Sequence, residues 1–290
     1  MKKVPIVSLA LALIAGFAFA GGGRDAGPQG ATQSAQAGAA AQPSTISIGG
    51  STSVTPLAES FQAEYARLHP NVTITISGTG SGDGIRGAGD GIYDIGMSSR
   101  SLTPAELGAG LNPITIAIDG IALIVHPSSP ITNLTTEQVR DIYTGDITQW
   151  QQLGAAANGK TGGIAVISRE PGSGTRGAFQ EILNYTDANL ATNANILDGT
   201  GAVRSSVAGN PSAIGYISIG SLNDSVKALN INGHAPTDTN VVNGSYTIAR
   251  PFIFITRHGH TPTAATQAFL DWSLSNAGQT IVSRNYVRVN

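Results

Sequence analysis

The stretch Ser168–Arg176, with the sequence SREPGSGTR, decides how the rest of this chain is interpreted. A short β-branched run at 163–167 precedes it, and large apolar residues follow it at helical spacing in 179–183. This pattern predicts a buried strand, a turn and a helix N-terminus. The two glycines let the turn point backbone amides inward, the serine and threonine add hydroxyl donors, and the arginines add fixed positive charge. The stretch is therefore predicted to bind an anion.

Two other stretches repeat this chemistry. Gly49–Ser53 (GGSTS) precedes a helical pattern at 57–68, and Gly78–Gly84 (GTGSGDG) follows the strand-like run 72–76. One such loop alone is equally typical of an ordinary capped helix with surface arginines. Three loops of the same kind favour a binding site, because converging helix N-termini offer free amides and partial positive charge to an anion.

The N-terminal residues are typical of export. Residues 1–20 carry two lysines, an apolar run and Ala18-Phe19-Ala20, as in a signal peptide with its cleavage site. Residues 21–43 are rich in Gly, Ala, Gln and Ser, which predicts a flexible linker before a fold that begins near Ser44. The mature protein is therefore expected to be periplasmic or otherwise extracytoplasmic.

Composition excludes several classes of function. The 290 residues include no cysteine, so disulfides, thiolate metal sites and cysteine nucleophiles are excluded. Beyond the leader, Lys160 and Lys227 are the two lysines of the sequence, which does not fit a nucleic-acid-binding surface. None of the five histidines lies in a metal-ligand array, so neither a metal nor a cofactor is expected.

The alternation of strand and helix patterns from Thr45 onward predicts an α/β fold. Two long apolar runs, 114–125 and 249–256, are each long enough to cross between two lobes. We therefore expect lobe 1 at 44–120, lobe 2 at 121–250 and a return to lobe 1 at 251–290. In lobe 2 the sequence predicts a helix at 135–143 with a capping box, and the return segment is expected to close with one helix at 263–282.

Together these motifs resemble the periplasmic phosphate-binding proteins of the PstS type, the receptors of phosphate ABC transporters. The resemblance covers nearly all of the chain after the linker. It rests on the following segments: Gly50–Pro56, Gly80–Gly82, Asp94–Arg100, Arg169–Arg176, Asp141–Gly145 and Asn210–Tyr216. It implies a two-lobed type II periplasmic binding protein fold, with a ligand cleft between lobes joined by two crossover segments.

The resemblance also implies which residues hold phosphate. By position these are Thr52, Ser53, Ser81, Arg169, Ser173, Gly174 and Thr175. The full expected ligand-binding set adds Asp83, Ser99 and Arg100 from the lobe 1 loops. One position departs from part of the family, because some members have at Ser99 an aspartate that accepts the proton of hydrogen phosphate. The acceptor here is predicted to be Asp83, with Ser99 and Glu170 as alternatives.

Two nucleotide-binding motifs lack their structural context. Residues 154–161 match the P-loop pattern but precede a strand rather than a helix, so we expect a surface loop. Residues 82–87 match G-x-G-x-x-G, but the Gly-rich stretch before Tyr93 is expected to be too short for a crossover helix.

The resulting hypothesis is a monomeric solute-binding protein, not an enzyme and with no catalytic residues. It would capture inorganic phosphate and deliver it to a membrane permease. One alternative is a receptor for sulfate, molybdate or tungstate, because donor loops bind any tetrahedral oxyanion. A more distant alternative is a secreted phosphatase.

Overall fold

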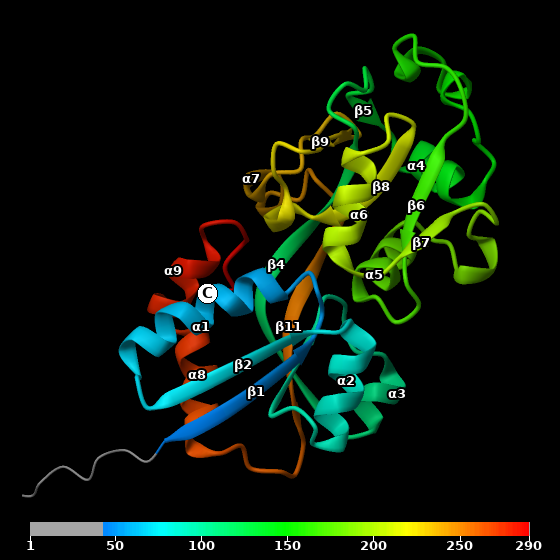
Figure 1. Cartoon of the computed structure of the whole chain (residues 1–290). Coiled ribbons are helices and arrows are strands. Elements are labelled where there is room, and N and C mark those ends of the chain that lie inside the picture. Colours follow the sequence, from blue (N-terminus) through cyan, green and yellow to red (C-terminus); the bar gives the residue numbers. More distant parts are fainter. Residues whose placement is uncertain (1–42, 290) are drawn as a thin grey trace, which may run out of the picture. The chain divides into compact units, whose positions relative to one another are not determined.

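The computed structural model describes residues 43–289 of the chain (Figure 1). The expected signal peptide at 1–20 and all of the expected linker except Pro43 lie outside these described residues. Within 43–289, nine strands form one continuous sheet in which β9 pairs with β4 and the others follow the order β2-β1-β3-β11-β4-β8-β6-β7. A separate two-stranded sheet joins β10 to β5. Helices flank the sheet, as expected for an α/β fold.

Lobe 1 has two apolar cores, a large one and a smaller one that includes Ile85 and Ile255. Its elements are β1 (Ser44–Gly50), α1 (Thr55–Leu68), β2 (Val72–Gly78), α2 (Ser81–Asp90), β3 (Ile95–Ser98), α3 (Pro104–Gly108), β11 (Ala249–Arg257), α8 (Ala264–Leu274) and α9 (Asn276–Val282). The strand β1 is parallel to β2 and β3, and β11 runs antiparallel to β3. The larger core lies between the sheet and the helices. It is filled by side chains from both the first and the last segments of the lobe, including Phe61, Phe254 and Phe269.

Lobe 2 has two cores of its own, one on each side of its strands. Its elements are β5 (Asn133–Leu134), α4 (Thr136–Thr144), η1 (Trp150–Ala157), β6 (Ala165–Arg169), α5 (Gly174–Ile182), η2 (Asp187–Asn189), β7 (Asn195–Leu197), α6 (Gly199–Ala208), β8 (Ala213–Ser218), η3 (Ile219–Ser221), β9 (Lys227–Ala228), β10 (Asn230–Ile231) and α7 (Asp238–Val242). Tyr143, Phe179 and Tyr216 pack together in one core, and Val203 and Val207 of α6 lie in the other.

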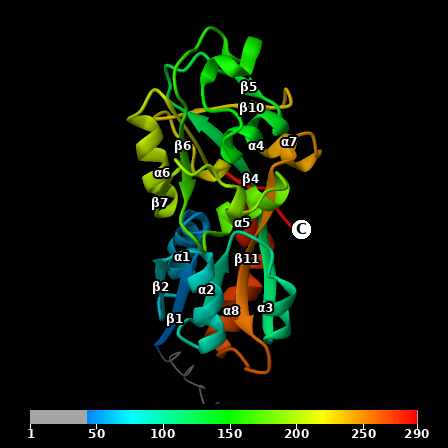
Figure 2. The same cartoon turned by 90° about the vertical axis from the view of Figure 1, so that its right-hand side faces the viewer.

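Two strands pass from one lobe to the other. The first half of β4 (Leu111–Val125) pairs with β11 in lobe 1, and its second half pairs with β8 in lobe 2. Figure 2 shows β4 and β11 running side by side between the two groups of helices. The expected two-lobed architecture with two crossover segments is therefore confirmed.

One prediction about local structure was wrong. The Gly-rich stretch before Tyr93 was expected to be too short for a crossover helix, yet residues Ser81–Asp90 form α2, which is ten residues long. Its glycines permit close packing: a Cβ on Gly84 would lie 2.6 Å from the Met97 carbonyl oxygen, and one on Gly87 would lie 2.4 Å from the ring of Tyr93. The helix therefore forms because the sheet packs against it at a distance that larger side chains would prevent.

The C-terminal segment also differs from the prediction, because the single closing helix is two helices. Ser275 is extended, with φ −69° and ψ 167°, and its hydroxyl accepts the Gly278 amide to begin α9. By contrast, the capping box that was predicted for α4 is present, with reciprocal hydrogen bonds between Thr135 and Gln138. None of the helices described here is long and apolar enough to cross a membrane.

Candidate anion-binding site

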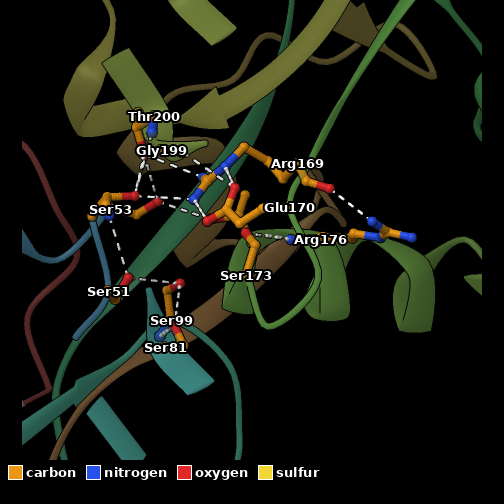
Figure 3. Close-up of polar contacts among 12 residues, drawn as sticks. Ser51, Ser53, Ser81, Ser99, Arg169, Glu170, Ser173, Arg176, Gly199 and Thr200 are labelled. Carbon is orange, nitrogen blue, oxygen red and sulfur yellow. Dashed lines mark hydrogen bonds and ion pairs between the residues drawn. The ribbon is translucent and has the colours of Figure 1, made fainter. Parts of the chain in front are cut away.

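Seven hydroxyl side chains meet where the two lobes touch (Figure 3). We call them the hydroxyl cluster: Ser51, Thr52, Ser53, Ser81, Ser99, Thr175 and Thr200. They come from loops that lie at or before the first turns of α1, α2, α5 and α6, and from the end of β3. Four helix N-termini therefore face one small region, which favours a bound anion.

Lobe 1 supplies a chain of three buried serines. The Ser51 hydroxyl donates to the Ser99 Oγ at 2.9 Å, and the Ser99 Oγ lies 3.3 Å from the Ser81 Oγ. The Ser99 amide also donates to the Ser81 Oγ, at 3.1 Å. Because each hydroxyl both donates and accepts, these three side chains can reorient their protons to suit an oxyanion.

Hydroxyls from opposite lobes touch directly. The Ser53 Oγ lies 2.8 Å from the Thr175 Oγ1 and 3.1 Å from the Thr200 Oγ1. The Thr52 Oγ1 accepts the Thr200 amide at 3.3 Å. These contacts show that the two lobes are closed on each other at the cluster.

Two backbone features make this closure possible. The Gly82 amide donates to the Gly172 carbonyl at 2.9 Å, which joins the lobes beside the cluster. A Cβ on Gly174 would lie 2.3 Å from the Ser81 Oγ and 2.8 Å from the Ser99 Oγ. The first turn of α5 therefore approaches the lobe 1 serines more closely than any residue other than glycine allows.

Arg169 brings a buried positive charge to the cluster. The residue is 1% exposed at the end of β6, and its Nη2 donates to the Thr52 Oγ1 at 3.0 Å. Its guanidinium also forms a two-pronged ion pair with Glu170, with distances of 2.7 Å from Nε to Oε2 and 2.6 Å from Nη2 to Oε1. The Glu170 Oε2 in turn accepts the Gly199 amide at 3.2 Å. The arginine is therefore oriented before any ligand arrives.

Side chains behind Arg169 support its backbone. Arg176 donates from Nη1 to the Arg169 carbonyl at 2.8 Å, and its other nitrogens donate to Asp187. The Tyr216 hydroxyl lies 2.9 Å from the Ser168 Oγ and accepts the Arg169 amide at 3.3 Å. Burial raises the pKa of Tyr216, so this phenol stays protonated beside the two arginines.

The structure places most of the expected ligand residues together, and three elsewhere. Thr52, Ser53, Ser81, Ser99, Arg169, Gly174 and Thr175 meet at the cluster. The Ser173 hydroxyl instead caps α5 by accepting the Arg176 amide at 3.3 Å. Asp83 forms an ion pair with Arg86 on the exposed side of α2, and Arg100 donates two hydrogen bonds of 2.8 Å to Glu106.

Sequence reasoning did not include Ser51 and Thr200. Ser51 belongs to the GGSTS loop that was already singled out, so its omission reflects only the choice among neighbouring hydroxyls. Thr200 is different, because its turn, Asp198-Gly199-Thr200-Gly201, was not considered. This turn follows β7 and opens α6, which is the same strand, Gly/Thr turn and helix pattern as the other loops.

A groove of about 430 Å³ leads from the surface to the edge of the cluster. Its lining includes Thr52, Glu170 and Gly199 of the site, together with the carboxylates of Asp83 and Asp198. No group of three or more His, Cys, Asp or Glu side chains that could hold a metal ion occurs within 43–289. The hydrogen-bond donors at this site are hydroxyls, amides and the Arg169 guanidinium.

Comparison with known proteins places the chain in a family. A family model described as a PBP superfamily domain matches residues 31–277. The phosphate-binding protein PstS of Borreliella burgdorferi is 32% identical over 247 residues, which cover 82% of this chain and 87% of that protein. The chain belongs to the PBP superfamily and, within it, to the PstS-type proteins.

Solved structures of PstS-type proteins share the fold. One is the X-ray crystal structure of a putative phosphate ABC transporter substrate-binding protein from Clostridium perfringens with bound phosphate. It is 44% identical with a TM-score of 0.82, and the match covers 85% of this chain and all of that one. An ABC-type phosphate transport receptor from Vibrio cholerae is 34% identical with a TM-score of 0.67, and the match covers 84% of this chain and 99% of that one. The type II periplasmic binding protein architecture that the resemblance implied is thus confirmed.

Proposed function

We propose that this protein binds one inorganic phosphate at the hydroxyl cluster and delivers it to the membrane permease of a phosphate ABC transporter. The observation that carries the proposal is the meeting of Arg169 with seven hydroxyls from both lobes, at four helix N-termini. The PstS-type relatives support phosphate as the ligand, since the Clostridium perfringens protein contains it. An extracytoplasmic, monomeric protein fits this role.

Within this proposal, phosphate is held by Thr52, Ser53, Ser81, Ser99, Arg169, Gly174 and Thr175. The Ser173 hydroxyl is not counted with them, because it caps α5. We add Ser51 and Thr200, because their hydroxyls lie within the same hydrogen-bonded cluster. We leave out Asp83 and Arg100, whose charged groups are paired with Arg86 and Glu106 away from the cluster.

Binding works by exchanging hydrogen-bond partners. In the closed protein the cluster hydroxyls and Arg169 bond to one another, and phosphate oxygens would replace these partners with stronger charge-assisted hydrogen bonds. Because the donors come from both lobes, the anion favours the closed arrangement through contacts that an open one lacks. The ion pair between Arg169 and Glu170 limits the net positive charge of the site. Hydroxyl and amide dipoles therefore contribute much of the binding free energy.

The Glu170 carboxylate is held by the Arg169 guanidinium and the Gly199 amide, rather than positioned as a general base for a hydroxyl of the cluster. This supports a binding protein rather than a phosphatase. A turnover assay with phosphate esters tests the point directly.

The experiment begins with protein stripped of endogenous ligand by unfolding and refolding in phosphate-free buffer. Calorimetric titration with phosphate is expected to give one site per chain, and thermal unfolding is expected to shift upward with phosphate concentration. At a hundredfold excess over the dissociation constant the stabilisation is about 2.7 kcal/mol. Sulfate, molybdate and tungstate are titrated in parallel. Absence of phosphate binding, or tighter binding of one of these anions, would contradict the proposal.

A further inference from the structure

A buried ion pair lies where the two crossover strands pass between the lobes. Asp119 on β4 and Arg250 on β11 face each other in antiparallel register, and the next residue pair is Gly120 opposite Ala249. Asp119 is 1% exposed and Arg250 is 3% exposed. Two opposite charges are therefore shut inside the segment that joins the lobes.

Each member of the pair reaches a different lobe. The Arg250 Nη2 and Nε donate to the Asp119 Oδ2 at 3.1 and 3.3 Å, and its Nη1 donates to the Ser99 carbonyl at 3.2 Å. The Asp119 Oδ1 accepts from the Ser218 hydroxyl at 2.8 Å. Ser99 follows β3 in lobe 1, whereas Ser218 ends β8 in lobe 2. The pair thus connects a loop of the anion site to the opposite lobe.

Stability alone does not explain this arrangement. The free-energy cost of desolvating a fully buried ion pair can exceed the Coulombic stabilisation that the pair gains. Well-packed apolar residues at the same positions often give a protein of equal stability. Burial raises the pKa of Asp119 to about 6 despite the neighbouring guanidinium, which shows how unfavourable the environment is for the carboxylate. Phe252, whose ring lies against the Arg250 guanidinium, adds a further apolar surface at this position.

We propose that Asp119 and Arg250 are positioning residues of the anion site, which hold the Ser99 peptide in place and tie its position to lobe 2. The inference rests on the proposed function, because Ser99 matters as a phosphate donor. With its carbonyl fixed by Arg250, the Ser99 amide and hydroxyl stay directed at Ser81 and Ser51. Ser218 is paired with Ile121, two residues beyond Asp119 on β4, so its hydrogen bond to Asp119 ties the ion pair to the lobe 2 end of this strand.

The test replaces the pair by apolar residues of similar size, in Asp119→Leu/Arg250→Met. The control is Arg67→Met/Glu64→Leu, which removes an exposed ion pair on α1 of lobe 1. Because the chain lacks cysteine, spin labels can be attached at Ala66→Cys on α1 and Ser205→Cys on α6, which are both exposed. Three quantities are measured: thermal midpoint without ligand, phosphate affinity, and the label-to-label distance distribution without ligand.

We expect the Asp119→Leu/Arg250→Met variant to unfold near the wild-type temperature but to bind phosphate about tenfold or more weakly. Its distance distribution is expected to broaden, while the control keeps the wild-type affinity and distribution. Wild-type affinity and an unchanged distribution in the first variant would overturn the inference.

Two further results are informative. If wild-type protein does not bind phosphate, the proposed function fails, yet the distance distributions without ligand still decide whether the pair holds the lobes. If the double variant does not fold, Ser218→Ala is the alternative, because it removes only the hydroxyl that donates to Asp119. It is expected to weaken phosphate binding severalfold at little cost in thermal midpoint, and an unchanged affinity would overturn the inference.

Discussion

The two lobes bring different chemistry to the same cluster. Ser51, Ser81 and Ser99 of lobe 1 are neutral and bond to one another, and the charged side chains nearest to them in sequence pair elsewhere on the surface. Lobe 2 instead brings Arg169, held by Glu170, together with the first turns of α5 and α6. This difference indicates a division of roles, in which lobe 2 attracts the anion and lobe 1 surrounds it with adjustable hydroxyls.

The largest effect is expected from removing the charge of lobe 2. Arg169→Ala takes away a charged donor, which costs about 1.5–3 kcal/mol, or about one to two decades in the phosphate Kd. The loss should lie at the upper end, because the variant also leaves the Glu170 carboxylate unpaired beside the anion. Calorimetric titration measures it.

The control for this variant is Lys160→Ala, which removes a lysine from the P-loop-like stretch 154–161. Lys160 donates to the Pro211 carbonyl at 2.7 Å, within lobe 2 and away from the cluster. Its loss should leave phosphate affinity unchanged. Equal losses of phosphate affinity in the two variants would mean that the Arg169 charge does not act directly on the bound anion.

The second prediction tests whether the lobes must approach as closely as they do here. Gly174→Ala puts a methyl group 2.3 Å from the Ser81 Oγ, so closure requires a shift of backbone. Overpacking of this kind costs typically about 1–3 kcal/mol, which we expect as a loss of phosphate affinity. Gly201→Ala is the matched control, because this glycine of α6 has open space around its Cβ position. Equal affinities of the two variants would show that close approach is not needed.

The third prediction concerns a single neutral hydroxyl of lobe 1. Ser99→Ala removes one neutral hydrogen-bonding group, so we expect a loss of about 0.5–1.5 kcal/mol in phosphate binding, smaller than for Arg169→Ala. If Ser99 also accepts the proton of hydrogen phosphate, the ratio of phosphate to sulfate affinity falls as well, since sulfate carries no such proton. Both anions are titrated with the same protein.

Asp83→Asn supplies the comparison for Ser99→Ala. Asp83 was the preferred proton acceptor from sequence, but its carboxylate pairs with Arg86 on an exposed face. We therefore expect the phosphate-to-sulfate ratio of this variant to match the wild type. A changed ratio would return Asp83 to the site and require rearrangement of α2.

The sequence predicted the loops of the site better than the side chains that fill it. Glycines, hydroxyls and a following helical pattern are local signals, so the turns at Gly49–Ser53 and Ser168–Arg176 could be recognised without the fold. Whether Asp83 or Arg100 faces the anion depends instead on which partner each one meets. Asp83 meets Arg86, three residues on, because the stretch forms a helix. Arg100 meets Glu106, which the capping box of α3 holds in place.

Tertiary packing explains the remaining differences. Helix α2 contains four glycines, which lower helix propensity. It forms because Gly84 lets it pack closely on β1 and β3, and Gly87 leaves room for the ring of Tyr93. In the sequence, Asp119 and Gly120 visibly interrupt the apolar run 114–125. The partner of Asp119, Arg250, lies 131 residues away. A contact of this range follows from the register of the crossover strands, which no local pattern specifies.

The smallest effect on phosphate binding is expected from removing the ion pair between Arg100 and Glu106, which both belong to lobe 1. Hydrogen bonding to Arg100 lowers the pKa of Glu106 to about 2 in the folded protein, from 4.5. Glu106→Gln should leave phosphate affinity unchanged, because Glu106 has no contact with the cluster. It should instead alter how stability depends on pH.

The sign follows from the lowered pKa of Glu106. A carboxylate whose pKa is lower in the folded state stabilises the protein above its unfolded value of 4.5, and this contribution is lost as pH falls through about 2. The free energy of unfolding of the wild type should therefore exceed that of Glu106→Gln at pH 7, by about 1 kcal/mol or less since the pair is partly solvated. The difference should shrink as the pH is lowered from 4.5 toward 2 in denaturant titrations. A constant difference over that range, or a loss of phosphate affinity in Glu106→Gln, would show that the ion pairs of lobe 1 are not separate from its ligand loops.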